Sequence, residues 1–100
     1  QFLDTFSSSG GSAFRQVVMV VYPRKGLWTL ALLTADTKGE IATKLDQEMI
    51  SVFVPTTPNP TSGWLLLVPK ADAIPLEMSV DEAFKLIISG GVLTPEYAPQ

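Results

Sequence analysis

The sequence contains no cysteine and no histidine. Without cysteine there is neither a disulfide framework nor a thiolate metal site. Without histidine the chain lacks the most common general base, the most common metal ligand and the side chain that titrates near neutral pH. A serine–lysine dyad of Ser62 and Lys70 has no supporting pattern around it. We therefore expect no catalytic residue, no metal site and no cofactor, and we predict that the chain is not an enzyme.

Charged residues are scarce, at 17% of the chain, and the net charge is −3. The basic residues do not cluster beyond Arg24 and Lys25, which disfavours nucleic acid as a partner because its binding requires a basic stripe. Apolar residues reach 46% and the mean hydropathy is +0.26. Some apolar surface is thus expected to meet something other than water. The longest apolar runs hold about six residues, whereas roughly 20 are needed to cross a bilayer.

The order of apolar and polar segments predicts one domain with short flanks. Residues 1–12 have the pattern of the end of an incoming helix followed by a flexible Ser/Gly linker. Residues 13–95 are predicted to form one soluble α+β domain, and residues 96–100 a tail. The abrupt start at Gln1, without an initiator methionine, indicates a piece cut from a longer protein.

Apolar runs predict four strands and a short extended piece, and β-branched residues dominate the first of them. They lie at residues 17–22, 27–34, 50–54, 64–68 and 74–76. A turn over residues 23–26, with Gly26 in the left-handed conformation, is expected to join the first two strands. Residues 35–49 form a polar excursion with a helical turn around Leu45. Pro75 places the last piece at an edge of the sheet.

A helix is predicted over residues 80–89. Ser79 and Glu82 have the spacing of a capping box, in which each side chain bonds the backbone of the other residue. Gly90 and Gly91 supply a left-handed stop. The residues expected on the apolar face recur at helical spacing. They are Val80, Ala83, Phe84, Ile87 and Ile88.

The loop at residues 56–63, between two predicted strands, is the main candidate for a binding site. Its candidate residues for a ligand or partner are Thr56, Thr57, Asn59, Thr61, Ser62 and Gly63. Their hydroxyls and amides could form a nest for a small anion, or an enzymatic site. The alternative is a rigid connection in which the polar side chains bond the loop's own backbone. The loop has no Walker pattern, and Pro60 prevents glycosylation of Asn59.

Arg24 and Lys25, at the tip of the first predicted hairpin, are candidates for contact with anionic lipid headgroups, together with Arg15. A solvated turn is the plainer interpretation of these cations.

The predicted strands are apolar on both faces, as strands buried on both sides are. One helix can cover only one face of the sheet, so the other face needs a cover. The possible covers are Phe2, Leu3, Phe6 and Phe14 folding back, a second copy of the chain, or membrane-side segments before Gln1. We favour self-association, because the linker at residues 7–12 is too flexible to fix the N-terminal residues.

Four motifs in this sequence resemble those of a known family. They are Val21-Tyr22-Pro23-Arg24-Lys25-Gly26-Leu27-Trp28, the segment from Val52 to Gly63, the segment from Met78 to Ala83, and Ile87-Ile88-Ser89-Gly90-Gly91. In this order they are similar to an uncharacterised bacterial membrane family related to the plant continuous-vascular-ring (COV-like) proteins. The resemblance implies two transmembrane helices before the soluble region, and no established activity or cofactor.

These observations together predict an α+β fold, with a mostly antiparallel sheet or half-open barrel of four to five short strands and one C-terminal helix. The predicted function is a non-catalytic soluble domain of a membrane-anchored protein that mediates protein contact or forms a homo-oligomer. The resemblance implies attachment to the bacterial inner membrane, with the domain facing the cytoplasm. A ligand site at the loop and lipid-headgroup binding are the alternatives.

Overall fold

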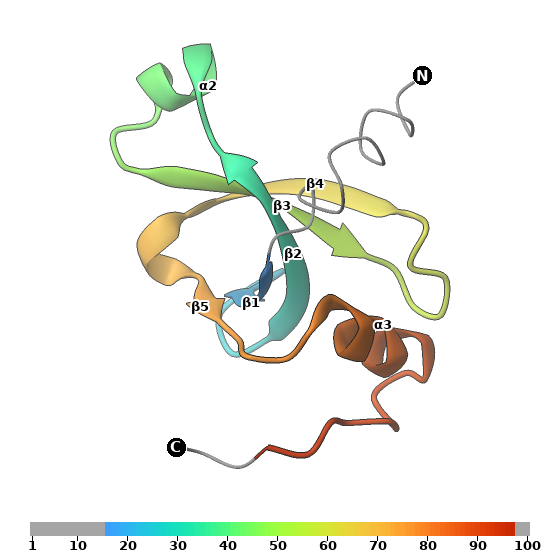
Figure 1. Cartoon of the computed structure of the whole chain (residues 1–100). Helices are drawn as coiled ribbons and strands as arrows, with labels where there is room; N and C mark the ends of the chain where they lie inside the picture. The colour runs from blue at the N-terminus through green and yellow to red at the C-terminus, as the bar shows by residue number, and fades with distance from the viewer. Residues whose placement is uncertain (1–15, 98–100) are drawn as a thin grey trace.

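A computed structural model describes residues 16–97, which form one five-stranded antiparallel sheet with three helices (Figure 1). The strands are β1 (Gln16–Val21), β2 (Trp28–Asp36), β3 (Met49–Pro55), β4 (Gly63–Pro69) and β5 (Ile74–Pro75). The helices are α2 (Gly39–Lys44), the 3-10 helix η1 (Lys70–Asp72) and α3 (Val80–Ile88). The strand order is β4-β3-β2-β1-β5. The predicted α+β fold with an antiparallel sheet and a C-terminal helix is therefore confirmed.

Some predicted features lie outside the described residues. These are the incoming helix and linker at residues 1–12, the apolar side chains proposed as a cover, Arg15, and the last three residues of the tail. Each predicted strand agrees with an observed one to within two residues at either end. Pro75 lies on the edge strand β5, as expected.

Two local predictions are wrong in position. The helical structure in the polar excursion is not centred on Leu45: α2 ends at Lys44, and Leu45 is its C-cap. The first hairpin turn lies one residue later than expected, because the Leu27 amide donates to the Arg24 carbonyl oxygen at 3.0 Å. The peptide bond between Tyr22 and Pro23 is cis. Gly26 has the expected positive φ, at 92°.

The sheet is curled, as the connection between its two edges shows. β4 and β5 lie at opposite edges, yet only residues 70–73 connect them. In a flat five-stranded sheet these edges would be about 19 Å apart at a spacing of about 4.8 Å per strand. Three of the connecting residues form η1, in which each residue rises only about 2 Å. The sheet must therefore bend around, and η1 carries the chain across the resulting gap (Figure 1).

The curl also brings distant side chains together. The rings of Tyr22, just after β1, and Trp64, on β4, have centroids 5.8 Å apart although β2 and β3 lie between their strands. A bulge in β2 helps to bend the sheet, since Leu33 pairs with Val52 but Ala35 already pairs with Ser51. The architecture is that of a half-open barrel.

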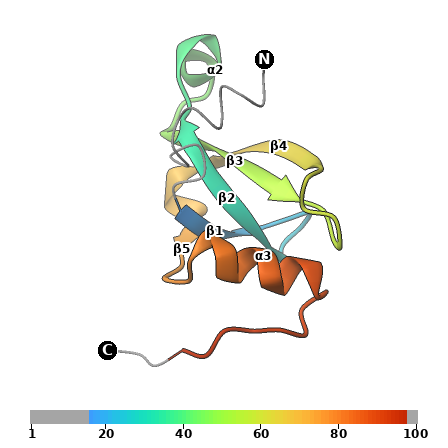
Figure 2. The same ribbon diagram turned by 45° about the vertical axis from the view of Figure 1, so that its right-hand side comes forward.

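The strands β1, β2 and β3 have buried residues on both faces, and alternate residues supply two separate cores. The concave face carries Val18, Val20, Ala31, Ile50, Val52, Val54 and Val68, with Tyr22, Leu33, Leu66 and Ala73 packed against them. The convex face carries Val17 and Leu32 under Ala83 of α3, with Leu30, Phe53, Leu76, Met78, Val80 and Phe84 around them. Figure 2 shows α3 lying across this convex face.

We predicted that one face of the sheet needs an external cover. For the centre of the concave face this prediction is wrong. Val18, Val20 and Val52 on the concave face are at most 2% exposed. The described residues that pack around them come from the sheet's own strands, from Tyr22 and from Ala73 next to η1. Because the sheet curls, its strands cover one another's concave side chains. The alternation of apolar residues along a single strand does not reveal this arrangement.

The capping box that starts α3 is confirmed. The Ser79 amide donates to Glu82 Oε1 at 2.9 Å, and the Glu82 amide donates to Ser79 Oγ at 3.1 Å. At the other end the Gly91 amide donates to the Leu86 carbonyl oxygen, with positive φ at Gly90 and Gly91. This pattern is a Schellman-type stop, as predicted.

The apolar face predicted for α3 is wrong at Ile88. Ala83 and Ile87 are buried and Val80 and Phe84 are half-buried, but Ile88 is 53% exposed. Ile88 is the last residue of α3. It lies about 100° around the helix axis from Ile87, at the margin of the apolar face.

Replacing Ser79 by alanine is expected to lower the free energy of unfolding by about 1 kcal/mol, because the Glu82 amide loses its acceptor. Urea denaturation followed by circular dichroism measures this change. Thr43→Ala in the exposed helix α2 is the control and should have a smaller effect. An unchanged midpoint for the Ser79 variant would contradict the capping geometry.

Candidate functional site

The candidate loop, residues 56–62, connects β3 to β4 and is closed by its own hydrogen bonds. At its base the Thr56 amide donates to the Ser62 carbonyl oxygen at 2.9 Å. The Thr56 hydroxyl is placed to donate to the carbonyl oxygen of Ser62, at 3.1 Å, or of Asn59. These bonds connect the two ends of the loop and its middle.

Asn59 organises the far side of the loop. Its side-chain oxygen Oδ1 accepts from the Thr61 amide at 3.1 Å and from the Thr61 hydroxyl. The pattern is that of an Asx turn, in which a short side chain replaces a backbone acceptor. Groups of Thr56, Asn59 and Thr61 that could have bound a ligand are thus used by the loop itself, which favours the rigid-connection alternative. Thr57 and Ser62 are exposed at the surface of the same loop.

Asn59→Ala removes the acceptor shared by the two Thr61 donors. Because the loop is exposed, we expect a loss of about 1 kcal/mol in unfolding free energy and faster amide exchange at Thr61. Hydrogen exchange measured by NMR checks both the loop and the rest of the sheet. Thr57→Ala is the matched control. Unchanged exchange at Thr61 in the Asn59 variant would show that the Asx turn is not formed in solution.

Gly63 belongs to the site for a steric reason. It opens β4 opposite Pro55, and a Cβ added there would collide with the Val54 carbonyl oxygen and lie 2.8 Å from the Phe53 ring. Only glycine lets the Phe53 ring and the neighbouring strand approach this closely. Gly63 is therefore a packing residue, and its role in ligand binding stays a prediction.

The turn that carries Arg24 and Lys25 lies between β1 and β2, away from the candidate loop in sequence. Both cations are exposed. Leu27 and Trp28 follow after Gly26 and are also exposed, Trp28 to 49%. The structure thus places two cations and two large apolar side chains on one hairpin end.

The outer edge of β4 is the feature that the sequence analysis missed. Within residues 16–97, β4 pairs with β3 on one side and with no strand on the other. Its residues Trp64 and Leu65 are 41% and 66% exposed. The signal in the sequence was the uncharged run from Trp64 to Val68, which was assigned to a strand but not to an edge.

The chain was compared with known protein families and with individual proteins. Residues 1–62 match the family described as "Protein of unknown function (DUF502)". The chain belongs to the DUF502 family. It is also similar to two proteins of Arabidopsis thaliana, "Protein LIKE COV 1" and "Protein CONTINUOUS VASCULAR RING 1", each 30% identical over 84 residues. The resemblance to COV-like proteins is therefore confirmed.

The matched region is 84% of this DUF502 chain but only 32% and 31% of the two relatives, so the chain spans about a third of their length. Neither protein's name states an enzymatic activity. No solved structure shows significant similarity to the chain.

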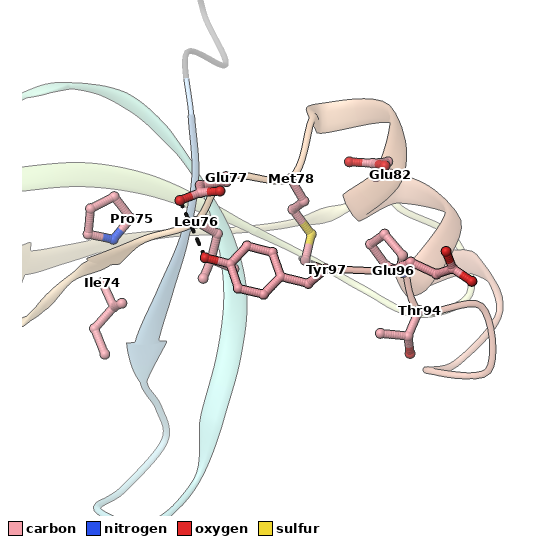
Figure 3. Close-up of a pocket in the computed structure, with 10 residues that line it drawn as sticks. Ile74, Pro75, Leu76, Glu77, Met78, Glu82, Thr94, Glu96 and Tyr97 are labelled. Atoms are coloured by element: carbon pink, nitrogen blue, oxygen red, sulfur yellow. Dashed lines mark hydrogen bonds between the residues drawn. The ribbon is translucent and has the colours of Figure 1, made fainter. Parts of the chain in front are cut away.

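A groove of about 640 Å³ lies between β5 and residues 94–97 of this DUF502 chain (Figure 3). Its floor is apolar, with Ile74, Leu76 and Met78, and three carboxylates stand around it. Two of these carboxylates have hydrogen-bond partners: Glu82 accepts from the Ser79 amide, and Glu77 accepts from the Tyr97 hydroxyl at 3.4 Å. Tyr97 in the C-terminal segment thus contacts the connection between β5 and α3.

Two further properties concern the described part of the chain. Among residues 16–97 no three acidic side chains gather closely enough to hold a metal ion. In the same range no helix combines the length and the apolar character that a membrane span requires.

Proposed function

We propose that this DUF502 chain is a non-catalytic domain that mediates contact between protein chains, in the first place between identical copies. The observation that carries the proposal is the exposure of large apolar side chains on the sheet despite its two well-packed cores. Leu65 and Trp28 lie on strands and are about half exposed or more. Such residues on a chain with only 17% charged residues favour a protein surface as their neighbour.

The arrangement of the loop supports the same proposal over a ligand site. The donors and acceptors of Thr56, Asn59 and Thr61 bond one another, so a ligand would have to displace these bonds. A rigid loop presented this way suits recognition by shape better than capture of a small anion.

The proposal places the domain in a longer, membrane-anchored protein. It is supported by the membership in the family and by the larger size of the relatives, of which the chain matches about a third. Attachment to the bacterial inner membrane, with this domain facing the cytoplasm, is part of the proposal. The test is to fuse the full-length protein to reporters that are active on only one side of the membrane, and to determine which fusion is active.

Sedimentation velocity over a range from about 1 to 500 μM tests the contact function on the whole chain. We expect a concentration-dependent rise in mass that persists at high salt, because apolar contacts are not screened. A monomer throughout this range, with no binding of a dye that detects apolar surface, would overturn the proposal.

A second function is favoured by the hairpin end, which presents Arg24 and Lys25 beside exposed Leu27 and Trp28. Cations next to an amphipathic aromatic ring suit the headgroup region of an anionic membrane. Sedimentation with vesicles containing anionic lipid is expected to show binding that falls with salt and with the double change Arg24→Ala and Lys25→Ala. The control is Lys38→Ala with Lys44→Ala, in exposed positions at α2. Equal binding by both variants would contradict this function.

A further inference from the structure

The two edges of the sheet differ sharply in their ability to accept another strand. β5 has two residues, one of them Pro75, which has no amide hydrogen to donate. β4 has seven residues and begins with six consecutive residues that each have an amide hydrogen. Within the described residues its outer edge is unpaired. An added strand can therefore bond only at β4 along a useful length.

The side chains of β4 lack the usual protection of an edge strand. Soluble proteins commonly place lysine, proline or an inward-pointing charge on such an edge to prevent pairing with another chain. The run from Trp64 to Val68 contains none of these. Leu65, on the convex face, is 66% exposed. The edge is thus open both in its backbone and in its side chains.

We propose that β4 pairs antiparallel with β4 of a second copy, so that two sheets join across a two-fold axis. This inference rests on the proposed contact function and assigns its surface. An axis perpendicular to the sheet sets one residue of β4 opposite itself and keeps the convex faces of both copies on the same side. With Leu66 at the centre, Leu65 lies opposite the partner's Leu67, and Trp64 lies opposite the partner's Val68.

The sequence of β4 suits this self-pairing. Every cross-strand pair in that register joins two apolar side chains, and pairs of this kind stabilise antiparallel strands. Residues 64–68 carry no charge, so two copies of β4 do not repel each other. A different partner could not be selected by complementary charge at this edge. One strand pair buries less than the roughly 1,200 Å² of a standard interface, so we expect a weak dimer with a Kd in the micromolar range.

A single cysteine tests the register, because the chain contains none of its own. Directly opposed residues of antiparallel strands have Cα atoms about 4.5–5.5 Å apart, within the range of a disulfide. Leu66→Cys is expected to form a disulfide-linked dimer under mild oxidation faster than Val92→Cys, a control at an exposed position outside the sheet. Equal rates for the two variants would contradict pairing centred on Leu66.

A second variant tests the edge without relying on a disulfide. Leu65→Lys removes an apolar side chain and brings two lysines to diagonal positions about 7–8 Å apart across the axis. The Kd of the dimer is expected to rise at least tenfold. Leu93→Lys is the control, since Leu93 is 58% exposed and lies outside the sheet.

The outcomes separate the inference from the function on which it rests. Loss of the dimer in Leu65→Lys, together with the Leu66→Cys disulfide, supports pairing at β4. A dimer that persists in Leu65→Lys and shows no preferential disulfide at Leu66→Cys overturns the β4 assignment and leaves the contact function standing. A chain that is monomeric at all concentrations overturns both.

Discussion

Leu32→Ala is expected to lower the free energy of unfolding by about 3–4 kcal/mol. Leu32 is the largest of the fully buried side chains, at 0% exposure, and lies between Val17 of β1 and Phe53 of β3 on the convex face. Truncation removes buried methyl groups and leaves a cavity under Ala83 of α3 that a paired sheet cannot close. Because a small domain is stable by only about 5–15 kcal/mol, this loss is a large part of the total.

Denaturant unfolding at low protein concentration measures the effect, so that any association does not contribute. Leu93→Ala, which truncates the same side chain at an exposed position, should change the unfolding free energy by less than about 0.5 kcal/mol. Helix α3 should also become more accessible to hydrogen exchange in the Leu32 variant. If the two leucine variants were equally stable, the packing of α3 on the convex face would be wrong.

Gly63→Ala is expected to lower the free energy of unfolding by about 2–3 kcal/mol. Here the cause is overpacking and not a cavity. The new methyl group would meet the Val54 carbonyl oxygen, a backbone atom that cannot rotate away, and the Phe53 ring. Relief requires β3 and β4 to separate at the start of their pairing, next to the candidate loop. The variant should therefore also loosen the loop, with faster amide exchange at Thr56.

Ser62→Ala is the matched control for Gly63→Ala. It changes the adjacent residue, whose carbonyl oxygen rather than side chain accepts the bonds from Thr56. Its effect should stay below about 0.5 kcal/mol. A Gly63 variant as stable as this control would show that the strands do not approach as closely as the structure indicates.

The curl of the sheet links the fold to the proposed function. It buries the concave face within the domain, so the apolar residues at its centre are not available to a partner. The exposed large apolar residues of the described sheet lie at strand ends or on the edge strands: Val21, Trp28, Trp64, Leu65 and Ile74. The contact surface is thus expected at an edge and not on a face.

The sequence by itself determined the elements whose signals are local. Apolar runs located the strands, and β-branched residues, which favour extended backbone, strengthened the assignment of β1. Ser79 and Glu82 located the start of α3, and Gly90 with Gly91 its end, because each acts on backbone groups within one turn. The sequence also offered the loop's internal hydrogen bonds as one of two alternatives, because Asn59 and Thr61 are only two residues apart.

Only the tertiary structure decided how the two apolar faces are covered and that β4 forms the second edge of the sheet. These properties depend on pairs distant in sequence, such as Tyr22 with Trp64, and on the short η1 connection that forces β4 and β5 toward each other. A period of two along a strand separates its faces but carries no information on curvature. The same limit applies to Ile88, whose spacing fits the apolar face of α3 although its side chain is 53% exposed in the structure.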